Sequence, residues 1–174
     1  MLSVFFALTS CETLKDPVVE LGPVYPLSGE WIVRFIKESP IKGDTSKFVT
    51  VTTSNDASNS TTSLWLRKTS NSFTTDTSSV LKGKILVKSF TVKATCNVDN
   101  KSFNVDNGAN TVLAAGASVG TCKVTNGKVT IDGWDTATGH KSDKITFKFE
   151  DSRTPGVVYT AEGYRRTGWL DDEP

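Results

Sequence analysis

The run of hydrophobic and polar residues from Leu27 to Glu38 predicts a β-strand that carries Arg34, Ile32 and Ile36 on its less discriminating face. One face of this predicted strand holds three large apolar residues: Trp31, Val33 and Phe35. A sheet that closes into a barrel must pair its first strand with its last, because only closure removes both unpaired edges. The final alternating run is Gly156–Thr167, so we expect it to be the partner of the first strand.

The rest of the chain repeats this pattern in short runs divided by turn residues, which is typical of an all-β barrel or sandwich. The runs are Lys47–Thr53, Thr62–Lys68, Gly83–Cys96, Ser102–Val105, Thr121–Thr125, Lys128–Ile131, Lys144–Glu150 and Gly156–Thr167. No long stretch shows helical periodicity. We therefore predict an all-β chain of about eight to ten strands.

Three features divide these runs. The apolar phase changes near Lys88–Ser89, which indicates a bulge or a break within Gly83–Cys96. The residues Asp106–Asn110 are expected to form a loop. Asn126-Gly127, between two alternating runs, is the strongest hairpin signal, because these residues suit the left-handed conformation of a tight hairpin turn.

The first residues are expected to carry a targeting signal. Leu2–Thr9 is mostly apolar, and Leu8-Thr9-Ser10-Cys11 resembles a bacterial lipobox, where a signal peptide is cut and the cysteine receives lipid. We interpret residues 1–10 as a truncated lipoprotein signal peptide, because the usual positively charged start is missing. The alternative is a buried first strand. Residues 11–27 contain three prolines and predict a tether, 28–168 the barrel, and 169–174 an acidic, solvated tail.

Composition narrows the partners and cofactors. The formal net charge is +1, so the sequence carries no basic footprint for nucleic acid. No apolar stretch approaches the ~20 residues of a spanning helix, so we expect membrane attachment through lipid on Cys11. The expected location is the bacterial cell envelope, at the outer membrane or cell surface. No cluster of histidine and cysteine has metal-ligand spacing, and we expect no metal or other cofactor.

The chain has three cysteines, an odd number. If Cys11 is lipidated, Cys96 and Cys122 remain as an even pair in a compartment that permits disulfides. Both fall on the inward phase of their strands, so two small buried thiols are the alternative to a bond. The sequence leaves both alternatives open, because pairing depends on geometry.

One set of residues follows the order of a serine hydrolase triad. Ser118 lies in a Gly-x-Ser-x-Gly motif, and Asp132 or Asp135 and then His140 follow it. Such a motif needs a helix after the serine, whereas the residues after Ser118 predict another strand. His140, the single histidine, lies in a polar turn. We therefore expect no catalytic residues in this set.

The end of the chain carries the most specific motif, Tyr159-Thr160-Ala161-Glu162-Gly163-Tyr164-Arg165-Arg166-Thr167-Gly168-Trp169-Leu170-Asp171-Asp172-Glu173. It resembles the closing motif of a family of bacterial lipoproteins, the lipid-binding putative hydrolases, which are similar to lipocalins. Other motifs fit the same family in the same order: the lipobox, Gly29-Glu30-Trp31, Asn126-Gly127-Lys128 and Ser142-Asp143-Lys144-Ile145-Thr146-Phe147.

The resemblance implies a lipocalin-like barrel, in which the tryptophan of Gly-x-Trp packs under an arginine from the far end of the chain. Trp31 matches the tryptophan. Arg165 is our candidate for the arginine, because it shares the phase of Tyr159 and Ala161, and Arg166 is the alternative if the strand bulges. The role implied for this pair is to close one end of the barrel.

The resemblance also implies an envelope lipoprotein whose barrel binds a small hydrophobic or lipid ligand. The inward aromatic residues would line its cavity: Trp31, Phe35, Phe90, Phe147, Phe149 and Tyr159. The same residues could instead fill a solid core, since an eight-stranded barrel has room for either. The protein would then be a structural or partner-binding surface lipoprotein, presenting Thr69–Ser79 and Asn97–Gly120 to another envelope protein.

Overall fold

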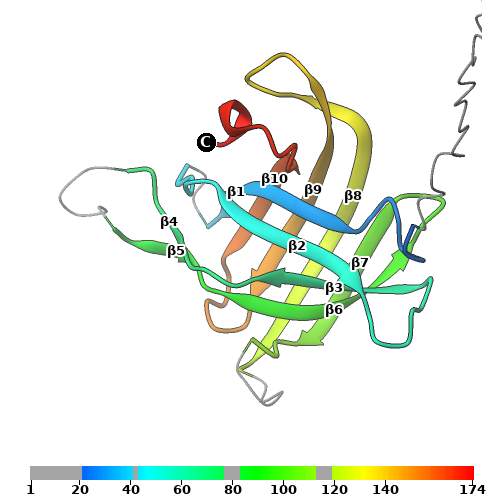
Figure 1. Ribbon diagram of the computed structural model, residues 1–174. Helices are drawn as coiled ribbons and strands as arrows, with labels where there is room; N and C mark the ends of the chain where they lie inside the picture. Colours follow the sequence, from blue (N-terminus) through cyan, green and yellow to red (C-terminus); the bar gives the residue numbers. More distant parts are fainter. Residues whose placement is uncertain (1–20, 41–42, 77–82, 113–118) are drawn as a thin grey trace, which may run out of the picture.

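The structure is a computed structural model that describes residues 21–40, 43–76, 83–112 and 119–174. Eight strands close into an antiparallel barrel in the order β1-β10-β9-β8-β7-β6-β3-β2 (Figure 1). Their bounds are β1 Gly29–Ser39, β2 Val49–Asn55, β3 Ser63–Lys68, β6 Phe90–Asn97, β7 Ser102–Ala109, β8 Thr121–Asp135, β9 Lys141–Asp151 and β10 Val158–Arg165. The predicted all-β antiparallel barrel is confirmed.

The barrel closes where the first strand meets the last. β1 pairs along one edge with β10, which brings Trp31 opposite Arg165, and along its other edge with β2. The alternation in β1 fixes which side chains enter the barrel. Trp31 and Phe35 are fully buried, whereas Arg34 lies on the outer face and pairs with Glu162. The closure therefore uses the strand pattern that the sequence predicts.

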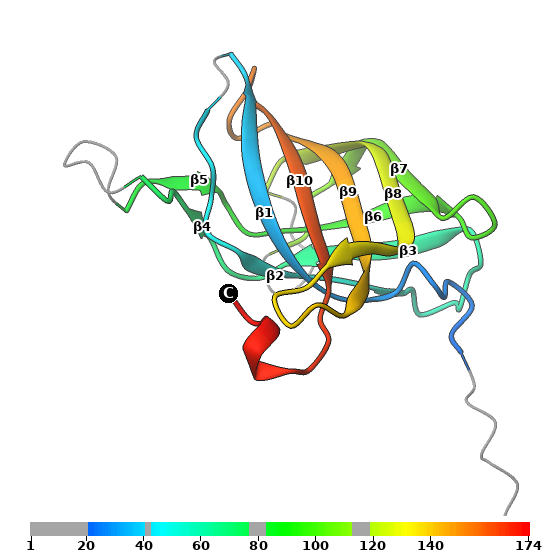
Figure 2. The same ribbon diagram turned by 90° about the horizontal axis from the view of Figure 1, so that it is seen from above.

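We name the two ends of the barrel after one residue at each. β1 begins and β10 ends at the Trp31 end, while β3 ends and β6 begins at the Lys68 end. A two-stranded ribbon, β4 (Ser72–Phe73) and β5 (Ile85–Val87), extends from the Lys68 end between β3 and β6, as Figure 1 and Figure 2 show. The predicted break near Lys88–Ser89 is confirmed, since these residues separate β5 from β6.

Aromatic side chains pack together inside the barrel. Phe90 stacks on Phe149 with ring centroids 4.3 Å apart, and Phe35 meets Phe149 edge-on at 6.1 Å. Phe147 lies against Phe35 at 6.1 Å and against Phe103 at 5.8 Å. All five rings are at most 3% exposed. Because the interior of an eight-stranded barrel is narrow, these rings form its core.

Two turn predictions are wrong. β8 runs through Asn126-Gly127, which form a bulge in its pairing with β7 and β9. Asn126 has a φ of 56°, the left-handed conformation that it would also adopt in a turn. A Cβ on Gly127 would overlap the carbonyl and ring of Phe103, so this position requires glycine. The predicted loop Asp106–Asn110 is mostly strand, because β7 continues to Ala109 with shifts of register.

Both ends of the described chain pack near the Trp31 end. Val24 and Leu27 fall in the predicted tether, yet both are fully buried. In the predicted solvated tail, Leu170–Asp172 forms a 3₁₀ helix (η2), in which Leu170 and Asp171 are exposed and Asp172 is buried. Burial acts to raise the pKa of Asp172, but hydrogen bonds from Thr138 and Thr167 outweigh it and lower this pKa.

Candidate functional site

The Lys68 end of the barrel holds a buried cation. Lys68 is the last residue of β3, lies on its inward phase, and is fully buried. Its Nζ donates to three main-chain oxygens, of Ser70 at 2.6 Å, Val87 at 2.9 Å and Lys88 at 3.3 Å. Nζ also lies 5.7 Å from the centre of the Phe35 ring. The described part of the chain therefore surrounds this ammonium with neutral partners and gives it no ion pair.

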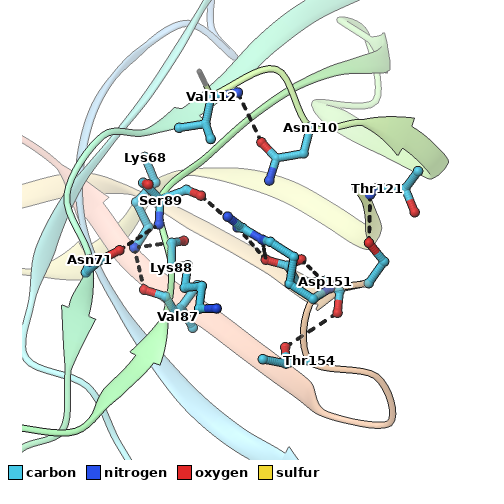
Figure 3. A network of polar contacts seen from close by, with 12 residues as sticks. Lys68, Asn71, Val87, Lys88, Ser89, Asn110, Val112, Thr121, Asp151 and Thr154 are labelled. Carbon is cyan, nitrogen blue, oxygen red and sulfur yellow. Dashed lines mark hydrogen bonds and ion pairs between the residues drawn. The ribbon is translucent and has the colours of Figure 1, made fainter. Parts of the chain in front are cut away.

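The segment Leu86–Ser89, which we call the strap, carries the chain from β5 into β6 at this end (Figure 3). Each of its four carbonyls accepts a hydrogen bond from a side chain. Tyr159 Oη donates to Leu86 O at 2.8 Å, and Arg153 Nη2 donates to Ser89 O at 2.8 Å. The two carbonyls between them, of Val87 and Lys88, accept from Lys68 Nζ. The side chains of Leu86 and Val87 are buried in the barrel core. The strap thus plugs the Lys68 end with two apolar residues.

Arg153 and Asp151 form a bidentate ion pair beside the strap. The guanidinium Nε and Nη2 lie 2.9 and 2.6 Å from Asp151 Oδ2, and Asp151 is 6% exposed. The hydrogen bonds to Asp151 raise the pKa of Arg153. Burial, aided by the charge of Arg153 and opposed by that of Asp151, lowers the pKa of Lys68 to about 7. Since the pair is neutral, protonated Lys68 gives this cluster one uncompensated positive charge.

Two buried polar atoms near the strap have no hydrogen-bond partner among the described residues: Ser72 Oγ and Asn110 Nδ2. Ser72 lies on β4 opposite Val87, the residue whose carbonyl binds Lys68. The amide oxygen of Asn110 accepts from Thr91 N at 3.0 Å. An unpaired buried polar group costs about 1–3 kcal/mol, so each of these two atoms would gain from a hydrogen bond to a further group.

The Trp31 end is closed by Arg165. Its guanidinium carbon lies 4.4 Å from the centre of the Trp31 ring. The same guanidinium donates to three oxygens, the carbonyls of Pro26 and Ser28 and the carboxylate of Asp143, at 2.5–3.0 Å. A Cβ on Gly29 would overlap Arg165 Nη1, so the glycine of Gly-x-Trp makes room for the arginine. This end is a structural closure.

The sequence profile of the lipid-binding putative hydrolases matches residues 16–170. The chain belongs to this family. No curated protein matches it. Within the described ranges, no helix is long and apolar enough to cross a bilayer. The same residues bring together no group of three or more side chains able to hold a metal ion.

The six aromatic residues predicted to bind lipid in this family member lie at different depths of the barrel. Trp31 lies under Arg165, far from the strap. Tyr159 binds the strap through its hydroxyl, and Phe90 follows the strap directly at the start of β6. The other three are Phe35, Phe147 and Phe149, whose rings contact one another between these positions. The structure therefore spreads the six from the Trp31 end to the strap.

Sequence reasoning missed Lys68 and the strap. Lys68 shares the inward phase of Leu64 and Leu66, so the alternation itself contained the signal of a lysine facing the core. Arg153 gave no such signal, because it lies in the turn between β9 and β10, where charged residues are ordinary.

The two described cysteines are free and buried. Cys96 of β6 pairs with Phe103 of β7, and Cys122 of β8 pairs with Gly108, five residues further along β7. Five residues of strand span about 16 Å, well beyond the Cα separation that a disulfide allows. Of the two alternatives, the structure contains buried thiols, and burial raises the pKa of Cys122 to about 12. Cys11 lies outside the described residues.

The hydrolase part of the family name directs attention to the serine motif. Ser118 lies outside the described residues. Its neighbour Val119 precedes β8, whereas His140 follows the far end of that strand. His140 is exposed and stacks on Trp169 with ring centroids 6.2 Å apart, and Asp135 pairs with Lys141. Asp132 is exposed. The histidine and one aspartate are thus engaged in surface contacts.

Replacing Arg165 with methionine should lower the free energy of unfolding by about 2–4 kcal/mol, because it removes the cation over Trp31 and three charge-assisted hydrogen bonds. Urea unfolding of Arg165→Met measures this loss. The matched control is Arg67→Met, since Arg67 lies 5.7 Å from the Trp65 ring on the exposed outer face. Its loss should stay below about 1 kcal/mol. Equal losses in the two variants would contradict the closing role of Arg165.

Lys68 should make stability depend on pH near neutrality. The pKa of Lys68 is about 7 in the folded protein, whereas the ordinary value for lysine is 10.5. Between these two pH values, the unfolded chain binds one more proton at Lys68 than the folded protein does. The free energy of unfolding of wild type, relative to Lys68→Met, should therefore rise with pH, approaching about 1.4 kcal/mol per unit above pH 7. Urea unfolding between about pH 6 and pH 8 measures this dependence below the ordinary thiol pKa of about 8.5.

The control for this measurement is Lys123→Met, which removes an exposed lysine and should keep the wild-type dependence. A constant difference between wild type and Lys68→Met across this range would show that Lys68 titrates normally.

Proposed function

We propose that this protein is a bacterial envelope lipoprotein, anchored through lipid on Cys11, whose barrel binds a small hydrophobic or lipid ligand at the Lys68 end. Family membership and the closed barrel support lipid binding in general. The observation that carries the location is the strap, whose carbonyls are bound by side chains and whose Leu86 and Val87 occupy the barrel interior. These two side chains fill the space that an acyl chain would take.

The two ends of the barrel fit an anchor at one end and ligand entry at the other. Val24 and Leu27 pack at the Trp31 end, so a chain anchored at Cys11 would join the barrel there. The Lys68 end is then left accessible. Its ribbon exposes Phe73 and Ile85, which are cross-strand partners and are 42% and 40% exposed. Such an apolar pair at the entrance favours contact with a lipid.

A second function is favoured by the packed aromatic core. If the aromatic rings packed around Phe149 do not move to admit a ligand, the barrel is solid. The protein is then a structural or partner-binding lipoprotein that acts through its loops. Mild crosslinking in the envelope followed by co-purification would then recover a protein partner, while the barrel itself would carry no lipid.

The anchor is tested by metabolic labelling with a fatty-acid analogue. We expect the label on the wild-type protein expressed in a bacterium, and no label on Cys11→Ala, since that variant lacks the acceptor thiol. Cys96→Ala, which removes a buried thiol, is the matched control and should keep the label. Label that persists on Cys11→Ala would contradict the proposed anchor.

Lipid binding is tested by native mass spectrometry after incubation with a total bacterial lipid extract. We expect lipid on the wild type and several-fold higher occupancy on Leu86→Ala, because this change shortens the plug of the strap. Leu64→Ala removes the same group from a fully buried position of β3, away from the strap, and should leave occupancy unchanged. Absence of lipid from the wild type and from Leu86→Ala would reject the ligand and favour the partner-binding function.

A further inference from the structure

We infer that the ligand of the Lys68 end is an acidic amphiphile, whose carboxylate or phosphate head binds Lys68 Nζ in place of the strap. This inference rests on the proposed function and names the chemistry of its ligand. The structure supports it through the cost of the buried charge, the partners of the strap, an unpaired hydroxyl and the position of the aromatic rings.

The first argument is the cost of burying Lys68. The side chain is fully buried, and its hydrogen-bond partners are main-chain carbonyls. Carbonyl dipoles offset part of the desolvation of an ammonium, but a buried charge is stabilised best by an opposite charge. Packing alone does not require the amine, because methionine has a similar length and no charge. An anionic head would supply the missing countercharge.

The second argument is the way in which the strap is held. Tyr159, Lys68 and Arg153 direct their donors at strap carbonyls, and these bonds are lost when the strap moves. A carboxylate or phosphate could replace the lost oxygens and form stronger, charge-assisted bonds. Arg153 is already neutralised by Asp151, so the uncompensated charge lies on Lys68. Figure 3 shows Lys68 and Asp151 beside the strap residues Val87, Lys88 and Ser89.

The third argument is the unpaired hydroxyl of Ser72. Ser72 is fully buried on β4, its Oγ has no partner among the described residues, and it lies opposite Val87. Val87 therefore both pairs with Ser72 across the ribbon and accepts a hydrogen bond from Lys68 Nζ. A head with two or more oxygens can bind both donors, which leaves neither unsatisfied.

The fourth argument is the apolar space next to the charge. Lys68 Nζ lies 5.7 Å from the centre of the Phe35 ring, and Phe35 contacts Phe149, which stacks on Phe90. Leu86 and Val87 pack in this cluster now. Their departure would open an apolar site that begins at the ammonium. The arrangement fits an acyl chain attached directly to an anionic head.

The experiment compares three probes that share one acyl chain: palmitate, palmitoyl lysophosphatidate and hexadecanol. Binding to the lipid-free wild type is measured by isothermal titration near pH 6.5, where Lys68 is largely protonated. We expect at least one acid to bind about tenfold or more tightly than the alcohol, and the tighter acid identifies the head. The preference should vanish in Lys68→Met and persist in Lys68→Arg, which keeps the charge.

A second readout does not depend on the stability of any variant. Arg153 and Asp151 are the charged groups that act on Lys68, and its deprotonation near pH 7 would remove the charge that binds the head. Raising the pH from about 6.5 to about 8.5 should therefore weaken binding of the acid to wild type about tenfold and leave hexadecanol unchanged. Equal affinities for acid and alcohol would overturn this inference and leave the proposed function intact. Failure of all three probes to bind would overturn both.

Discussion

The structure depends on how little room an eight-stranded barrel leaves inside. Its interior is just wide enough for side chains, and the rings of Phe35, Phe90, Phe147 and Phe149 occupy it. A ligand can enter such a barrel only if some of the packed side chains leave. Residues on the barrel strands cannot move far, because each strand is paired along both edges. The segment that moves must therefore contribute side chains to the core without being one of the paired strands of the barrel.

The two ends of the barrel differ in this respect. At the Trp31 end, Arg165 joins the start of β1, the end of β10 and Asp143 of β9, so the closure is part of the barrel wall. At the Lys68 end, Leu86 and Val87 belong to a separate two-stranded sheet and are tied down by side chains of other strands. Moving this segment breaks a few hydrogen bonds and leaves the strand pairing of the barrel intact.

The alternation of residues in the sequence predicts the strands well, because strands follow from which face is apolar. The closing contact is implied by the resemblance to lipocalins, and the phase of Arg165 favours it over Arg166. Trp31 and Arg165 meet as their phases require. The Asn126-Gly127 turn is wrong for a physical reason, since a left-handed residue followed by glycine serves a bulge as readily as a hairpin. Asp172 is buried where it accepts two hydrogen bonds from Thr138, which lies 34 residues away and is therefore contained in no local pattern.

Lys68 shows what a local pattern can and cannot reveal. Its phase in β3 places it inside the barrel, and this much is readable from the sequence. Its hydrogen-bond partners are the carbonyl of Ser70, two residues away, and the carbonyls of Val87 and Lys88 in the strap, 19 and 20 residues further along the chain. Those partners determine whether a buried lysine only packs in the core or can also bind an anion. Because all three are neutral carbonyls and two of them lie on a separable segment, the charge is stabilised only in part, and a ligand that brings a full negative charge gains most by replacing those two.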